Sequence, residues 1–194
     1  LLVTFRSGYS DEFARARWNV APGILREAVG ASYQEFSNLL EDLPVTGDGI
    51  DLPEDAAATA WADGLELESA DALVTYVHLH FGRFPAIVSK QVGKGRVTYC
   101  GTLPNEALGR ALASWTMEQA NIAPIMEELP TSVRVVASRA TSGERLLFFT
   151  NWSWTPQTLP SIPGGGRELF SDSQISENDA LSIGAWDVKI VVQS

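Results

Sequence analysis

The sequence predicts an α/β layer followed by a small all-β antiparallel sandwich, and three observations lead to this prediction. Residues 1–128 combine short apolar runs with one clear amphipathic helix, the pattern of a helix packed on a sheet. Residues 129–194 hold short strand-like runs separated by turns, without helical periodicity. The chain has 194 residues, of which 45% are hydrophobic, so it can bury a sizeable core.

The apolar runs of the first region are expected to form strands. Residues 1–5 are nearly all apolar, as in a strand buried on both faces of a parallel sheet, and a long polar loop follows at 6–20. Pro22-Gly23 introduces a short helix, with Gly30 as its C-cap. An exposed connection is expected at 43–54. Further strands are predicted at 33–36, 59–67, 73–79, 86–91 and 96–100.

The clearest helix is predicted over residues 104–119. Pro104 suits the first turn of a helix, and Thr102 is a candidate N-cap. One face of this helix is apolar, with Leu108, Ala111, Leu112 and Trp115. Just before it, Gly93 and Gly95 form a tight turn that makes the last two strands a hairpin.

The second region is predicted to begin near residues 128–131. Turn-forming residues separate several of its short strands, as expected for an antiparallel sandwich or barrel. The predicted strands lie at 133–138, 145–150, 155–159, 168–170, 180–183 and 188–192.

Composition limits the partners and the compartment. The net charge of −10 and pI of about 4.6 disfavour nucleic acid and anionic membranes. No apolar run approaches the roughly 20 residues of a membrane span. The single cysteine, Cys100, excludes an internal disulfide and favours a reducing, cytoplasmic setting. Because the chain opens on a strand-like run without an initiator methionine, we expect further sequence upstream.

Two reactive residue types are candidates for chemistry. His78 and His80 are two apart on a predicted strand and would share one face, but no third ligand lies nearby, so strand position explains the pair best. Cys100 precedes Gly101 at a strand-to-helix turn, yet the nucleophile-elbow pattern lacks its first glycine. A buried, inert cysteine is therefore predicted.

Other motifs also have simpler explanations. Gly164-Gly165-Gly166-Arg167 leads into a strand and not a helix, so it is a turn and not a phosphate-binding loop. Asn151-Trp152-Ser153 matches the glycosylation pattern, which is common by chance. Core packing is favoured for Trp152 and Trp154 over stacking on a sugar. Solvated loop charge explains the acidic pairs Asp11-Glu12, Glu41-Asp42, Asp48/Asp51 and Glu54-Asp55. We therefore assign no catalytic, cofactor-binding or metal-binding residue and expect no cofactor.

The order of segments resembles the C-terminal portion of glycoside hydrolase family 42 β-galactosidases. The resemblance covers essentially the whole chain and rests on a collinear series of segments, none of which is diagnostic alone. The segments are LLVTFRSGYSDEF, APGILREAVG, TAWADGLELESADALVTYV, FPAIVSKQVGKGRVTYCGT, VRVVASR and RLLFFTNW.

This resemblance implies a specific role for the chain. The family has a catalytic TIM barrel, a flavodoxin-like trimerisation domain related to class I glutamine amidotransferases, and a small β-domain. Residues 1–128 would be part of the trimerisation domain, incomplete at its N-terminus, and 129–194 the β-domain. Both catalytic glutamates of the retaining mechanism would lie in the barrel, upstream of this chain. The implied partners are that barrel and two further copies of the chain in a homotrimer.

Two other functions stay open at this stage. A degenerate glutamine-amidotransferase-like protein would require a reactive Cys100. A free-standing carbohydrate-binding module would use Trp152 and Trp154.

Overall fold

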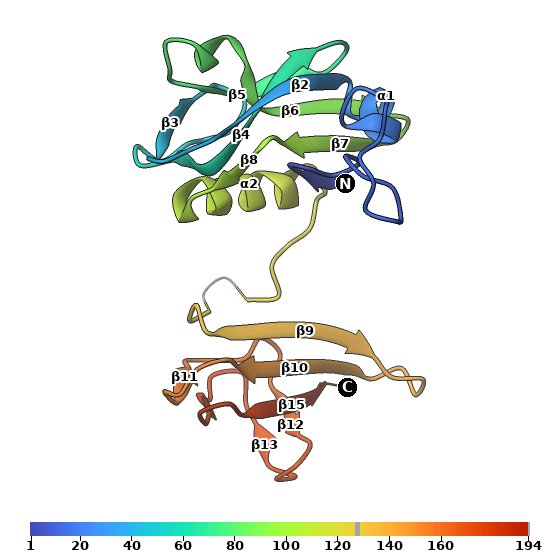
Figure 1. Cartoon of the computed structure of the whole chain (residues 1–194). Helices are drawn as coiled ribbons and strands as arrows, with labels where there is room; N and C mark the ends of the chain where they lie inside the picture. The colour runs from blue at the N-terminus through green and yellow to red at the C-terminus, as the bar shows by residue number, and fades with distance from the viewer. Residues whose placement is uncertain (127–128, 194) are drawn as a thin grey trace. The chain divides into compact units, whose positions relative to one another are not determined.

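A computed structural model describes residues 1–126 and 129–193 of the chain (Figure 1). The chain divides into two compact units, Leu1–Ile122 and Ala123–Ser194, here called unit 1 and unit 2. The predicted boundary at residue 128 lies outside the described residues. Within the described part, no helix is both long and apolar enough to span a membrane.

Unit 1 is built on an eight-stranded sheet with the order β1-β7-β6-β5-β3-β4-β2, in which β8 pairs with β4. β1 runs parallel to β7, and the other pairings are antiparallel. Two of these strands were not predicted from the sequence. β3 lies in the segment where an exposed connection was expected, and β8 lies just before the long helix. The strands are β1 (Leu2–Thr4), β2 (Ala31–Asn38), β3 (Leu43–Thr46), β4 (Ala57–Leu67), β5 (Asp71–Tyr76), β6 (Pro85–Val92), β7 (Gly95–Cys100) and β8 (Thr102–Pro104).

The predicted α/β flavodoxin-like layer is wrong. Such a layer has parallel strands joined by crossover helices, whereas from β2 to β7 successive strands are joined without an α-helix. A short connection can only return the chain antiparallel, as the β6–β7 hairpin does at Gly93. Unit 1 is therefore a mixed, mostly antiparallel sheet with few helices.

Two α-helices and two 3-10 turns accompany this sheet. The short helix α1 (Arg26–Val29) follows η1 (Gly23–Leu25) and ends at Gly30, whose φ of 72° confirms the predicted C-cap. η2 (Phe81–Arg83) precedes β6. Helix α2 (Glu106–Gln119) ends as predicted but begins later.

The N-cap of α2 is Asn105, so the assignment to Thr102 is wrong. The Asn105 side-chain oxygen accepts hydrogen bonds from the backbone N–H of Leu108, at 2.9 Å, and of Ala57 in β4, at 3.1 Å. Thr102 instead lies buried in β8, and its hydroxyl donates to the carbonyl oxygen of Trp61. Pairing of β8 with β4 thus delays the helix start.

The core of unit 1 lies where α2 and β4 pack against the central strands. Leu108 and Leu112 of α2 contact one buried cluster, and Val29 of α1 contacts a second. The first cluster also holds Leu43, Ile50, Ala56, Ala58, Ala62, Val74, Tyr76, Phe84, Ala86, Ile87 and Cys100; the second holds Val3, Ala31, Tyr33, Leu65, Val88, Val97 and Tyr99.

Unit 2 is all β in its described residues. A five-stranded antiparallel sheet, ordered β13-β12-β15-β10-β9, packs on the two-stranded ribbon β11-β14. Alternation along β10 turns Leu147 and Phe149 inward against Leu159 and Ile183 of the ribbon. β13 has no counterpart among the predicted strands. The strands are β9 (Val133–Arg139), β10 (Arg145–Asn151), β11 (Gln157–Leu159), β12 (Gly166–Glu168), β13 (Gln174–Ile175), β14 (Leu181–Ile183) and β15 (Val188–Gln193).

Candidate functional site

Aromatic and cationic side chains gather around Trp61 at the surface of unit 1. Trp61 on β4 stacks on Phe36 of the neighbouring β2, with ring centroids 4.6 Å apart and an interplanar angle of 15°. Phe5, just after β1, lies 6.1 Å from the Trp61 ring. The Arg6 guanidinium carbon lies 5.2 Å from the same ring, within range of a cation–π interaction. We call Phe5, Arg6, Phe36 and Trp61 the Trp61 cluster.

A fully buried carboxylate holds Trp61 in place. Asp63, two residues along β4, accepts a hydrogen bond from the indole Nε1–H of Trp61 at 2.8 Å. Its second oxygen accepts from the Tyr99 hydroxyl on β7 at 3.0 Å. Burial raises the pKa of Asp63 to about 6, although both hydrogen bonds and the charge of Arg6 oppose the shift.

Tyr76 and Tyr99 both hydrogen-bond to Asp63, and Tyr33 lies beside Tyr99. The Tyr76 hydroxyl lies within hydrogen-bond distance of two backbone carbonyl oxygens, that of Asp63 at 3.3 Å and that of Gly101 at 3.2 Å. Burial and then the Asp63 charge raise the pKa values of Tyr76 and Tyr99. The buried Tyr33 hydroxyl has no hydrogen-bond partner among the described residues. Because Asp63 is completely buried and bonded to the indole of Trp61, it serves to position Trp61.

The outer face of the Trp61 cluster remains open. Phe36 is 47% exposed, and Arg6 is also exposed. Aromatic residues and arginine are the types enriched at the centres of protein–protein interfaces. The arrangement therefore suits contact with another protein surface better than chemistry.

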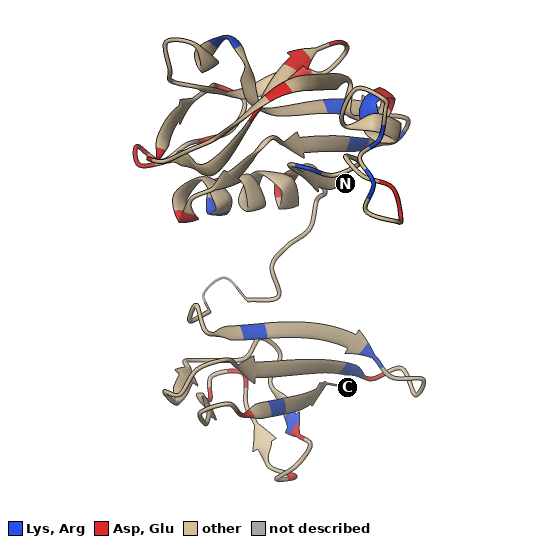
Figure 2. Ribbon diagram, viewed as in Figure 1, with Lys and Arg blue, Asp and Glu red and all other residues tan. Residues whose placement is uncertain are grey.

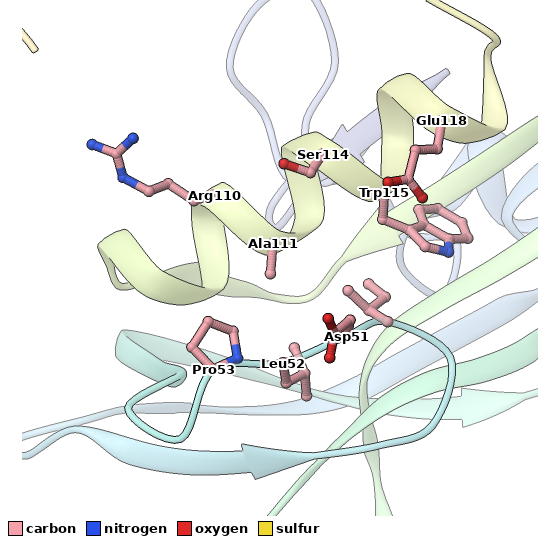
Figure 3. A pocket seen from close by; sticks show the side chains of 9 residues that line it. Asp51, Leu52, Pro53, Arg110, Ala111, Ser114, Trp115 and Glu118 are labelled. Carbon is pink, nitrogen blue, oxygen red and sulfur yellow. The ribbon is translucent and has the colours of Figure 1, made fainter. Parts of the chain in front are cut away.

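A separate hollow of about 390 Å³ lies between α2 and the loop after β3 (Figure 3). Asp51 reaches it from the loop, and Glu118 and Trp115 reach it from α2. Arg110 on its rim pairs with Glu106 at 2.7 Å. Asp51 and Glu118 are both exposed to solvent. They therefore do not form an enclosed pair of carboxyl groups like the pair that flanks the glycosidic bond in a glycosidase.

Comparison with known proteins gives the family. The chain matches the profile of the β-galactosidase trimerisation domain over residues 1–123 and that of the β-galactosidase C-terminal domain over residues 132–193. The chain belongs to glycoside hydrolase family 42. This confirms the resemblance found in the sequence.

The relatives of this family 42 chain are much longer than the chain. A β-galactosidase of Halorubrum lacusprofundi is 30% identical over 207 residues, covering 96% of this chain and 29% of the relative. One from Heyndrickxia coagulans is 30% identical, covering 97% and 27%. The crystal structure of a β-galactosidase from Bacillus circulans sp. alkalophilus superimposes with a TM-score of 0.81 at 23% identity, covering 100% of this chain and 29% of that one. The chain therefore spans less than a third of these proteins.

Cys100 of this family 42 chain is buried, as predicted. Its thiol donates to the Thr102 carbonyl oxygen at 3.4 Å, and burial raises its pKa to about 11. A catalytic cysteine needs the opposite shift, because the thiolate is the nucleophile. The amidotransferase-like alternative therefore loses its main support.

The two histidines do not lie on a strand, so that part of the prediction is wrong. β5 ends at Tyr76, and His78 and His80 are exposed in the turn before η2. The Nδ1 atom of His78 accepts from the backbone N–H of His80 and Phe81, at 3.2 and 3.1 Å, which fixes this turn. Across the described ranges, no group of three or more His, Cys, Asp or Glu residues is placed to hold a metal ion.

The glycine motifs and acidic pairs lie in turns and loops. Gly164, Gly165 and Gly166 all have positive φ and lead into β12, which confirms a turn in place of a phosphate-binding loop. The predicted acidic pairs lie in turns and loops, and Figure 2 marks all described Asp and Glu residues in red. Asp11 has a local function, since its side chain accepts from the backbone N–H of Phe13 and Arg15 at 2.9 Å.

The prediction that Trp152 and Trp154 pack in the core is wrong. Both follow the end of β10 and are exposed, and both rings contact Trp186, which sequence reasoning missed. Asn151 is buried instead, and its amide donates to the carbonyl oxygens of Thr155 and Gly184. A glycan on Asn151 would replace one of the two amide hydrogens and so break at least one of these hydrogen bonds.

Proposed function

We propose that this chain is the subunit-association and structural region of a family 42 β-galactosidase. The complete enzyme would hydrolyse terminal β-D-galactosides with retention, using two glutamates of an upstream barrel that this chain does not contain. The observation that carries the proposal is the match of residues 1–123 to the trimerisation domain of β-galactosidases. Residues 1–128 would associate subunits, and residues 129–194 would form the C-terminal region.

The Trp61 cluster is the surface we assign to this association. A homotrimer with threefold symmetry needs two different surfaces per subunit, each contacting the next copy. Phe36, Trp61 and Arg6 supply a preorganised aromatic and cationic surface, because Asp63 fixes the Trp61 ring from below. Such a surface is the expected centre of one of these two contacts. A cytoplasmic location, suggested by the single cysteine, completes the proposal.

Sedimentation analysis of the purified chain tests association directly. We expect a species of three times the 21.0 kDa chain mass at micromolar concentration. Replacing Phe36 by Ala should weaken this trimer at least about fivefold, because truncating a central aromatic residue often costs more than about 1 kcal/mol of binding. Phe170→Ala, at an exposed phenylalanine of unit 2, is the matched control and should leave the mass unchanged.

Activity measurements test the second part of the proposal. The chain alone should not hydrolyse a chromogenic galactoside, and fusion to the upstream sequence should restore turnover. Turnover by the isolated chain would refute a non-catalytic role. A monomer at every concentration would refute association through this region.

A further inference from the structure

Three tryptophans converge on one exposed face of unit 2. Trp152 and Trp154 follow β10, and Trp186 lies in the turn between β14 and β15. The Trp186 ring centroid lies 6.0 Å from that of Trp152 and 5.6 Å from that of Trp154, with interplanar angles of 83° and 72°. The three residues are 61%, 84% and 51% exposed, respectively. We call Trp152, Trp154 and Trp186 the tryptophan triad.

Backbone hydrogen bonds fix the triad before any ligand arrives. The N–H of Trp186 donates to the Ser153 carbonyl at 3.0 Å, and the N–H of Trp152 donates to the Ser132 carbonyl at 2.8 Å. The buried Asn151 amide ties the Trp152 turn to the Trp186 turn through the Gly184 carbonyl, at 2.8 Å. Trp186 itself has φ 51°, a left-handed conformation that is costly for a bulky residue. Because the backbone that carries the three rings is fixed in this way, a ligand need not order these turns when it binds.

The exposed indoles match the chemistry of a neutral sugar. An edge-to-face contact covers at most one face of the ring pair, so most ring faces in the triad are not covered by another indole. An indole face carries negative quadrupole charge, which attracts the C–H groups on the flat side of a pyranose. The Nε1–H of Trp152 donates to the Thr150 hydroxyl at 2.9 Å. Those of Trp154 and Trp186 make no hydrogen bond to any described residue and can donate to sugar hydroxyls. A neutral ligand is also not repelled by the acidic chain.

We propose that the tryptophan triad binds pyranose units of a neutral oligo- or polysaccharide. Three rings match one or two sugar units in size, whereas a stable protein interface buries about 800 Å² on each partner. The neighbouring acid does not compete for this role, because Asp187 already accepts from the backbone N–H of Gly184 and Val188. The choice of a galactan as the first probe rests on the proposed β-galactosidase function; the sugar-binding surface itself does not.

Affinity electrophoresis through gels that contain soluble galactan tests the proposal on the full chain. The unmodified chain should be retarded, and Trp154→Ala should lower the affinity at least about fivefold, since one stacked aromatic ring is lost. Trp154 is the triad member of choice because it is the most exposed of the three. Trp18→Ala, at a fully exposed tryptophan of unit 1, is the matched control and should migrate like the unmodified chain.

A second readout requires no substitution. Galactan fragments should shift the indole Nε1–H resonances of Trp154 and Trp186 more than those of Trp18 and Trp115. The proposal is overturned if galactan, xylan and a soluble β-glucan all fail to retard the chain, or if Trp154→Ala is retarded as strongly as the unmodified chain. It is also overturned if Trp154→Ala changes only the sedimentation of the chain, which would make the triad a protein interface. If the unmodified chain binds sugar but stays a monomer at every concentration, the proposed association alone is refuted.

Discussion

Among the described residues, units 1 and 2 each bury one carboxylate, and the pKa values of the two shift in opposite directions. Asp63 in unit 1 has two side-chain donors, Trp61 and Tyr99, and burial raises its pKa to about 6. Burial also acts on Glu168 in unit 2, but hydrogen bonds from Ser171 and Phe170 outweigh it, so its pKa is lowered. The Ser171 hydroxyl and N–H lie 2.6 and 2.8 Å from Glu168 Oε2.

The two carboxylates differ in their depth and in their hydrogen-bond donors. Glu168 accepts from its own turn, two and three residues ahead, so the donors are fixed by local geometry and serve the charged form. Asp63 accepts from side chains on two strands and lies deeper, at 0% exposure. The balance between burial and hydrogen bonding therefore sets the direction of each shift: burial outweighs the two donors at Asp63, and the donors outweigh burial at Glu168.

The largest expected effect concerns the apolar core of unit 2. Phe149→Ala should lower the free energy of unfolding by about 3–5 kcal/mol, because the ring is completely buried and its loss leaves a cavity. Phe148→Ala, on the outward side of β10, is the control and should cost much less. Urea denaturation, monitored through the hydrogen exchange of the β10 amides, measures the loss of stability in both variants. Equal losses would contradict the assignment of the inward face.

The pH dependence of unit 1 is the next largest effect. A folded pKa of about 6 lies above the usual value for Asp, so folded Asp63 retains its proton where the unfolded chain has lost it. The stability of unit 1 should therefore fall as pH rises from about 4 to 7, by roughly 3 kcal/mol. Asp63→Asn should abolish this slope, and Asp71→Asn, at an exposed site, should not. Urea midpoints of β7 amide protection across this pH range give the measurement.

Unit 2 should show the opposite sign through Glu168. A lowered pKa favours the folded state above the unfolded pKa, and this contribution disappears as pH falls through the folded value. Glu168→Gln should cost about 1–2 kcal/mol at pH 7, since charge-assisted hydrogen bonds are lost, and should remove the acid sensitivity. Guanidinium denaturation at pH 7 and pH 3, monitored through the protection of the β12 and β15 amides, compares the stability of unit 2 with Glu168 charged and with Glu168 protonated. Unchanged acid sensitivity in the variant would assign it to another group.

The smallest expected effect lies on the surface of unit 1. Glu106→Gln removes the ion pair with Arg110. The side chain of Glu106 is 75% exposed and that of Arg110 is 66% exposed. The loss in stability should stay below about 0.5 kcal/mol, because solvent and salt screen exposed pairs. Thermal unfolding at low and high salt checks this. A larger loss would indicate that the rim of the hollow beside α2 is more tightly organised than its exposure suggests.

Local patterns predicted the strands better than their arrangement. A short strand-like run located β10, and two glycines located the β6–β7 hairpin. The direction and partner of each strand depend on contacts between distant segments, so the flavodoxin-like layer was wrong. Asp63 was missed because it lies within a predicted strand, although a carboxylate between Ala62 and Gly64 was an available signal. Trp186 was missed because it lies in a turn, far along the chain from Trp154, with no periodicity to mark it.

The buried Cys100 gives this chain an internal reporter. It is the single cysteine of the chain and lies in unit 1, so a thiol-specific reagent can modify it only when unit 1 opens. The rate of modification therefore measures the opening of unit 1, while unit 2 contributes no signal. A covalent probe can thus follow one unit of an intact chain without any engineered site.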